Sequence, residues 1–168
     1  MKWAIIVLIM LSLVGSMMWV MPTPRQRFQA KLRLEARKHG LQVSLGHLAL
    51  PRAQGEMEAE ELKCPVYRLP RTNLARSERD SFMGWTVARI TAIANEGLPA
   101  GWSWVKGERT LAPARLNQLS EWLESLPKEV EAIESDQIHL ALYWREPERA
   151  GALDELAERA KQAIELKL

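Results

Sequence analysis

The sequence predicts an α+β fold: one N-terminal transmembrane helix, followed by a small cytoplasmic domain in which helices cover an antiparallel sheet. Three patterns in the 168 residues carry this prediction. The chain opens with an uncharged stretch, continues with segments of alternating apolar residues, and ends with stretches that repeat apolar residues at helical spacing. We therefore expect a transmembrane anchor at 1–22, a basic juxtamembrane helix at 23–40 and an α+β soluble domain at 41–168.

The first segment has the length of a membrane span. Residues 3–21 are 19 residues without a charge, and as a helix they would extend over about 28 Å, close to the hydrocarbon thickness of a bilayer. Trp3 and Trp19 stand near its two ends, where indole rings prefer the membrane interface. A cleaved signal peptide is the alternative, but the stretch is longer than the usual apolar core and lacks a small-residue cleavage site.

The distribution of Lys and Arg predicts the orientation of this anchor. Only Lys2 precedes the uncharged stretch, whereas six cations follow it within 18 residues. This asymmetry predicts a bacterial inner-membrane protein with its C-terminal domain in the cytoplasm. The single cysteine, Cys64, agrees with a reducing compartment. The six cations are Arg25, Arg27, Lys31, Arg33, Arg37 and Lys38.

These cations lie on a predicted helix at 24–39. Thr23 suits the N-cap, Pro24 the first helical position, and Gly40 the left-handed residue that ends a helix. The cations can face anionic lipid headgroups, or they can serve only to fix the insertion topology. Nucleic acid is disfavoured as a partner, because residues 40–168 carry a net formal charge of −4.

Alternating apolar residues predict the strands of the soluble domain. Leu41, Val43 and Leu45 alternate with polar residues, as do Leu62, Cys64 and Val66 after a polar loop. Because Pro65 cannot donate a backbone hydrogen bond, we expect the second of these to be an edge strand or a strand end. Residues 70–81 are expected to form a polar connection, and further strands are predicted at 85–93 and 102–105.

The second half of the chain predicts two helices around a hairpin. Leu116, Leu119, Leu123 and Leu126 fall on one side of a helix that we expect at 113–126. Two runs joined by a short polar turn predict a hairpin, and a terminal helix carries an apolar stripe. The hairpin runs are 130–134 and 138–144, and the stripe extends over 153–164.

No motif in the sequence predicts catalysis, a metal site or a cofactor. There is no G-x-S-x-G, H-E-x-x-H, C-x-x-C or glycine-rich phosphate loop. No two of His39, His47 and His139 have the spacing of metal ligands on a helix. None of the three belongs to a recognisable motif with a serine or cysteine nucleophile. We therefore expect a protein that is not an enzyme and has no catalytic, cofactor-binding or metal-ligating residue.

The tryptophan-rich middle leaves one alternative open. Trp85, Trp102 and Trp104 fall on alternating positions, which favours packing in the core. The same residues would suit a ligand groove with converging polar groups, so a membrane-tethered ligand-binding domain or enzyme is the alternative function.

The opening of the chain resembles a known plan. An N-terminal apolar span, an exit of Pro22, Pro24 and Arg25, a basic helix and a small domain are similar to YajC-like single-pass inner-membrane proteins, accessory to the Sec preprotein translocase. A gammaproteobacterial group of this length and opening pattern is similar too. The resemblance is architectural and covers about the first 50 residues.

This resemblance implies an accessory or interaction subunit of a membrane complex, in protein export, with a membrane protein as its partner. Close packing of the span against another transmembrane helix would use the small residues Ser12, Gly15 and Ser16.

Overall fold

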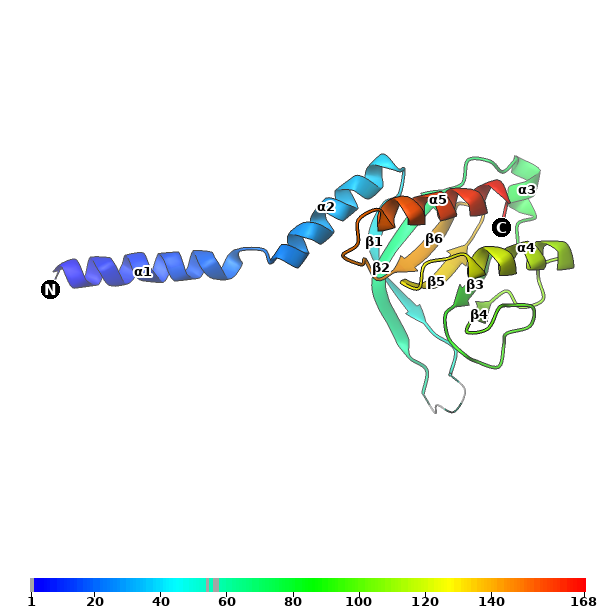
Figure 1. Ribbon diagram of the computed structural model, residues 1–168, viewed down its shortest axis with the longest axis horizontal. Helices are drawn as coiled ribbons and strands as arrows, with labels where there is room; N and C mark the ends of the chain where they lie inside the picture. Colours follow the sequence, from blue (N-terminus) through cyan, green and yellow to red (C-terminus); the bar gives the residue numbers. More distant parts are fainter. Residues whose placement is uncertain (1, 54, 56–57) are drawn as a thin grey trace. The chain divides into compact units, whose positions relative to one another are not determined.

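The computed structural model describes residues 2–53, 55 and 58–168, without the side chains of 17–20. It divides into two compact units, Met1–Leu32 and Arg33–Leu168. The second unit contains the whole six-stranded sheet (Figure 1).

The first unit is helical. Helix α1 extends over Lys2–Val20, and helix α2, Pro24–Lys38, begins in this unit and continues into the second. The start of α2 confirms the predicted N-cap: the Gln26 backbone N–H donates to Thr23 Oγ1 at 3.3 Å, and the Thr23 N–H donates to Gln26 Oε1 at 2.9 Å. This reciprocal pair is a capping box that satisfies two N–H groups at the helix start.

The structure contradicts the predicted transmembrane anchor. Among the described residues, no helix combines the length and the apolar character that crossing a membrane requires. The interpretation of 1–22 as a single-pass signal anchor is therefore wrong.

The second unit is built on a six-stranded antiparallel sheet, as the sequence predicts for this class of fold. The spatial order is β1-β2-β6-β5-β3-β4, so the C-terminal hairpin is inserted between the two earlier pairs of strands (Figure 1). The strands are β1 Gln42–Ala49, β2 Glu61–Pro70, β3 Trp85–Ala88, β4 Ser103–Lys106, β5 Val130–Ser135 and β6 His139–Trp144.

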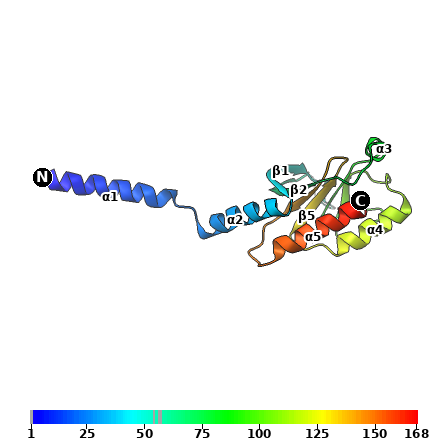
Figure 2. The ribbon, with the colours of Figure 1, turned by 90° about the horizontal axis from the view of Figure 1, so that it is seen from above.

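Two long helices cover one face of this sheet. Helix α4, Pro113–Glu124, and helix α5, Ala152–Glu165, lie side by side on that face, while the short helix α3, Arg76–Asp80, lies beyond its end (Figure 2). The buried residues of α4 and α5 are leucines, alanines and Trp122, which fit the predicted apolar stripes. On the sheet, the face that carries Ser135 meets the end of the chain, where the hydroxyl donates to the Leu168 carbonyl at 2.9 Å.

The opposite face of the sheet has its own core, built from strands and the residues next to them. Strand register places Val66 and Ala132 beside Tyr143 on this face. The cluster combines small and large side chains from strands β2, β3, β5 and β6. Its members are Leu62, Cys64, Val66, Ala88, Ala132, Ala141 and Tyr143, with Leu48, Leu50, Ile90 and Val105 packed against them.

The predicted elements occur in their predicted order, with two differences. Strand β2 lies between β1 and β6 and is not an edge strand. Pro65 is tolerated because the pairing of β2 with β6 begins only at Val66, so the missing N–H falls where that ladder stops. The connection expected at 70–81 contains α3, whose start is held by the Ala75 N–H donating to Glu78 Oε2.

Candidate functional site

A hollow of the second unit lies between α3, the start of α4 and the end of the chain. It has a volume of about 260 Å³. Apolar and polar side chains share its wall, which comes from four separate segments of sequence. The lining residues are Leu74, Glu78, Ser81, Phe82, Met83, Trp85, Thr110, Leu111, Ala112, Arg115, Lys167 and Leu168, and we call this hollow the α3–α4 cavity.

The charged residues of the α3–α4 cavity are two cations and one carboxylate. Lys167 Nζ lies 2.5 Å from Glu78 Oε1, and the pair is partly exposed. The hydrogen bond from Lys167, followed by that from the Ala75 N–H, lowers the pKa of Glu78 below its usual 4.5. Arg115 contributes further to this shift through its charge, while it forms no hydrogen bond or ion pair with any residue that the structure describes.

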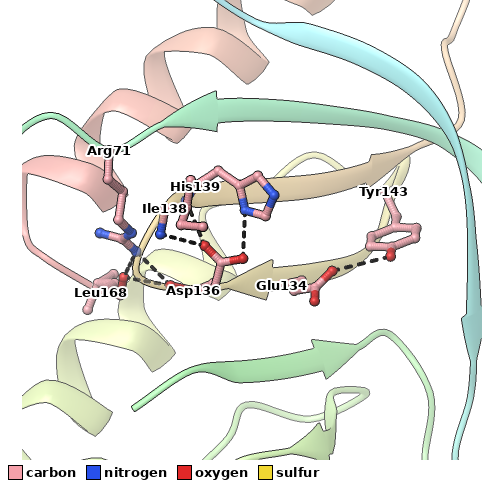
Figure 3. A network of polar contacts seen from close by, with 8 residues as sticks. Arg71, Glu134, Asp136, Ile138, His139, Tyr143 and Leu168 are labelled. Atoms are coloured by element: carbon pink, nitrogen blue, oxygen red, sulfur yellow. Dashed lines mark hydrogen bonds and ion pairs between the residues drawn. The ribbon is translucent and has the colours of Figure 1, made fainter. Parts of the chain in front are cut away.

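Two buried groups at this cavity have donors without acceptors. Trp85 is 1% exposed, and its indole N–H has no partner among the described residues. Arg71, 4% exposed, lies behind the wall with its guanidinium 4.8 Å from the centre of the Phe82 ring. Its Nη2 donates to Ser135 Oγ at 2.6 Å and to the Leu168 carbonyl, whereas its other two nitrogens have no described partner (Figure 3).

Burial lowers the pKa of Arg71 to about 10, an effect that the charge of Asp136 opposes and that of Arg115 reinforces. The side chain is therefore still a cation at neutral pH. Asp136 itself organises the β5–β6 turn: its Oδ1 accepts the backbone N–H groups of Ile138 and His139, each at 2.7 Å, and its Oδ2 lies 2.9 Å from His139 Nδ1 (Figure 3).

The hydroxyls of the cavity are not arranged as nucleophiles. Ser81 Oγ donates to the carbonyls of Ser77 and Glu78, and Thr110 Oγ1 donates to the Gly107 carbonyl at 2.6 Å. Neither contacts a histidine or carboxylate that would accept its proton. Within the described part of the chain, no three His, Cys, Asp or Glu side chains are grouped to hold a metal ion.

A second polar cluster holds the C-terminal part of α2. Arg33 binds the buried carboxylate of Glu146 with two hydrogen bonds, Nε to Oε1 at 2.7 Å and Nη2 to Oε2 at 2.9 Å. The Tyr67 hydroxyl donates to the same Oε1 at 2.9 Å. Hydrogen bonding of Arg33 to the Glu146 carboxylate, which accepts, raises the pKa of Arg33, and burial raises the pKa of Tyr67. This cluster connects α2, β2 and the segment after β6.

The residues predicted to contact lipid take two different positions. All six basic residues of α2 are exposed: Arg25, Arg27, Lys31, Arg33, Arg37 and Lys38. Arg33 in addition binds Glu146. On α1, Ser12, Gly15 and Ser16 are exposed, and Trp3 is 80% exposed. The side chain of Trp19 lies outside the described residues.

The tryptophans do not form one common groove. Trp102 and Trp104 are each 3% exposed, and Trp102 lies under the Arg89 guanidinium at 4.6 Å. Trp104 lines a separate hollow of about 240 Å³ together with Glu96 and Arg109. Only Trp85 reaches the α3–α4 cavity.

Sequence reasoning singled out Arg33 of the second cluster, as a cation facing lipid and not as the partner of Glu146, and it missed the other polar residues of both clusters. Arg71, Arg115 and Lys167 are far apart in sequence and belong to no motif, and Glu146 follows a strand without a recognisable spacing to Arg33. Trp85 was the one cavity residue with a signal, as part of the tryptophan-rich middle.

No family model, curated protein or solved structure matches the chain.

Proposed function

We propose that this protein is a non-enzymatic interaction protein, an accessory subunit that binds a larger protein assembly through α1. The observation that carries the proposal is the exposure of the apolar side chains of α1. From Ile5 to Leu11, seven consecutive apolar residues are each at least 50% exposed.

The arrangement of these side chains restricts the kind of partner. Successive residues of a helix are rotated by about 100°, so seven consecutive apolar residues place apolar surface on every side of α1. A partner with one flat surface would leave half of them in water. We therefore propose an apolar groove between helices of the partner, which encloses α1.

The small residues of α1 fit such an enclosed helix. A Cβ added at Gly15 would meet nothing within 4 Å, and Ser12 and Ser16 lie one turn before it and next to it. Small side chains allow two helix backbones to approach closely. Burying one exposed leucine or isoleucine contributes about 1.5–3 kcal/mol, so the whole segment supplies a strong driving force for association.

The test is co-purification of the full-length protein, tagged at its C-terminus, with identification of the recovered proteins by mass spectrometry. We expect a defined set of partner proteins, which the double variant V7N/L11N loses because two polar side chains, one turn apart, interrupt the apolar surface. The variant I93N is the matched control, since Ile93 is 92% exposed and lies in the second unit.

Three outcomes would contradict the proposal: recovery of lipid without protein, equal recovery with V7N/L11N, or equal loss with I93N. Recovery of preprotein translocase subunits would support the role in export that the resemblance implies.

A second function, binding of a small ligand by the second unit, is favoured by the α3–α4 cavity and its unpartnered donors.

A further inference from the structure

We propose that the α3–α4 cavity binds a small organic carboxylate, whose charged group contacts Arg115 and whose apolar body packs among the apolar side chains of the wall. This site lies in the second unit and does not depend on association through α1.

The size of the cavity suits a ligand built on one ring. Its volume of about 260 Å³ exceeds the roughly 150 Å³ of an apolar cavity that accommodates benzene. Part of the wall is apolar and comes from three different segments of the chain. These residues are Leu74, Phe82, Met83, Leu111 and Leu168.

The charge distribution calls for one negative group. Lys167 is neutralised by Glu78 at 2.5 Å, whereas Arg115 has no hydrogen bond or ion pair with a described residue. A guanidinium can bind both oxygens of a carboxylate with two parallel hydrogen bonds. Its charge already acts at this place, because it contributes to lowering the pKa of both Glu78 and Arg71.

Backbone dipoles and a buried donor point to the same kind of ligand. Helix α4 has 12 residues and begins at the cavity, where Ala112 is its N-cap and no side chain accepts a hydrogen bond from its first turn. A helix start favours a negative group. Trp85 provides an independent observation, since this residue lines the same hollow and its buried indole N–H has no described acceptor. A carboxylate oxygen would satisfy it.

A phosphate dianion fits the wall less well than a carboxylate. Among the described residues of the wall, only Arg115 is available to pair with a ligand, because Lys167 is paired with Glu78. The Glu78 carboxylate in the same wall would repel a dianion, and the apolar side chains would make no favourable contact with an inorganic ion. We therefore expect the cavity to select ligands both by their single negative charge and by their apolar part.

The test is a titration of the full-length protein with benzoate, benzyl alcohol and inorganic phosphate, followed by the indole ¹H–¹⁵N signals. The Trp85 signal is assigned by its loss in W85F. We expect saturable shifts of this signal with benzoate, and binding that is about tenfold or more weaker for benzyl alcohol and for phosphate.

Two variants at the cavity should change benzoate affinity in opposite directions. R115A should weaken it about tenfold, because the charged partner is removed. E78Q should strengthen it several-fold, because a like charge beside the ligand is lost while the amide can still accept the Ala75 N–H. Since misfolding would weaken binding in both, a gain with E78Q cannot come from unfolding.

The matched control is R76A, which removes the same charge from the exposed side of α3 and should leave affinity unchanged within twofold. The proposal is overturned if benzoate causes no saturable shift, if benzyl alcohol or phosphate binds as well as benzoate, or if R76A weakens binding as much as R115A. The result of the co-purification with V7N/L11N does not affect the interpretation of these binding measurements.

Discussion

Glu146 occupies a backbone conformation that its side chain has to stabilise. Its φ is +29°, a region that non-glycine residues rarely adopt and that costs roughly 1–3 kcal/mol. The carboxylate, whose side chain is 2% exposed, accepts two hydrogen bonds from Arg33 and one from Tyr67. We infer that these three bonds offset both the strain and the burial of the charge.

Removing Arg33 should therefore cost more than removing the Tyr67 hydroxyl. R33M leaves a buried carboxylate without its cation and is expected to lower the free energy of unfolding by about 2–3 kcal/mol. Y67F removes one hydrogen bond and should lower it by about 1 kcal/mol. Urea unfolding followed by circular dichroism measures both.

The double variant R33M/E146M supplies the control for this pair. It removes both charges and should recover part of the loss of R33M. If R33M and Y67F lower the free energy of unfolding by the same amount, the Glu146 carboxylate does not need the charge of Arg33 to be stable in the folded protein.

Cys64 is a packed core residue, as its place on an alternating strand suggests. It is 5% exposed, and burial, with a smaller contribution from the charge of Glu131, raises the pKa of its thiol to about 11. Because the thiolate is the reactive form, we expect iodoacetamide at pH 7.5 to leave the folded protein unmodified and to modify it in 8 M urea, as measured by mass. Rapid alkylation of the folded protein would contradict this.

At the scale of elements, strands β1, β2 and β6 approach one another closely at Gly46. A Cβ added at Gly46 of β1 would lie 2.2 Å from Val66 Cγ2 of β2 and 3.0 Å from Tyr143 Cε1 of β6. The absence of a side chain at this position lets the tyrosine ring approach the backbone of β1. Small residues thus shape the core of this face as much as large ones.

G46A should destabilise the protein by about 1–3 kcal/mol, because the added methyl overfills the contact with Val66. The matched test is the double variant G46A/V66A, which makes room for the methyl. We expect the double variant to lose less free energy of unfolding than the sum of the losses measured for G46A and V66A alone. Strict additivity would show that the contact does not carry the effect.

The β5–β6 turn depends on one carboxylate. Asp136 accepts two backbone N–H groups at 2.7 Å each and so fixes the hairpin that supplies the two central strands. D136A is expected to lower the free energy of unfolding by about 1–3 kcal/mol, whereas D136N, which retains an acceptor oxygen, should lower it less. Thermal unfolding of the two variants side by side decides between these outcomes.

At the scale of the whole molecule, stability should fall at both ends of the pH range. The pKa of Glu78 is lowered from 4.5, chiefly by Lys167, so its contribution is present above pH 4.5 and is lost as the pH falls through the lower folded value. The pKa of Cys64 is raised from 9.0 to about 11, so its contribution is present below pH 9 and is lost as the pH rises toward 11.

The melting temperature measured from pH 3 to pH 11 should therefore be highest between about pH 5 and pH 9. E78Q should reduce the fall of the melting temperature at acid pH without changing its fall at alkaline pH. C64A should reduce the fall at alkaline pH without changing the fall at acid pH. A variant that shifts both sides equally would show that the groups do not act independently.

The sequence by itself determined the local elements of this protein. Capping at Thr23, the stop at Gly40 and the polar turn after β5 depend on residues within a few positions of one another, so their physical chemistry is readable along the chain. Alternation and helical spacing, for the same reason, predicted the strands, α4 and α5.

Only the tertiary structure decided the strand order, the place of Pro65 and both polar clusters. Strand β2 pairs with β6, 69 to 77 positions away, and Arg33 binds Glu146 across 113 positions. No local pattern encodes such partners, since many pairings satisfy the same alternation. The α3–α4 cavity likewise exists only because the sheet, α3 and the end of the chain pack together, which brings Arg115, Lys167 and Trp85 to one place.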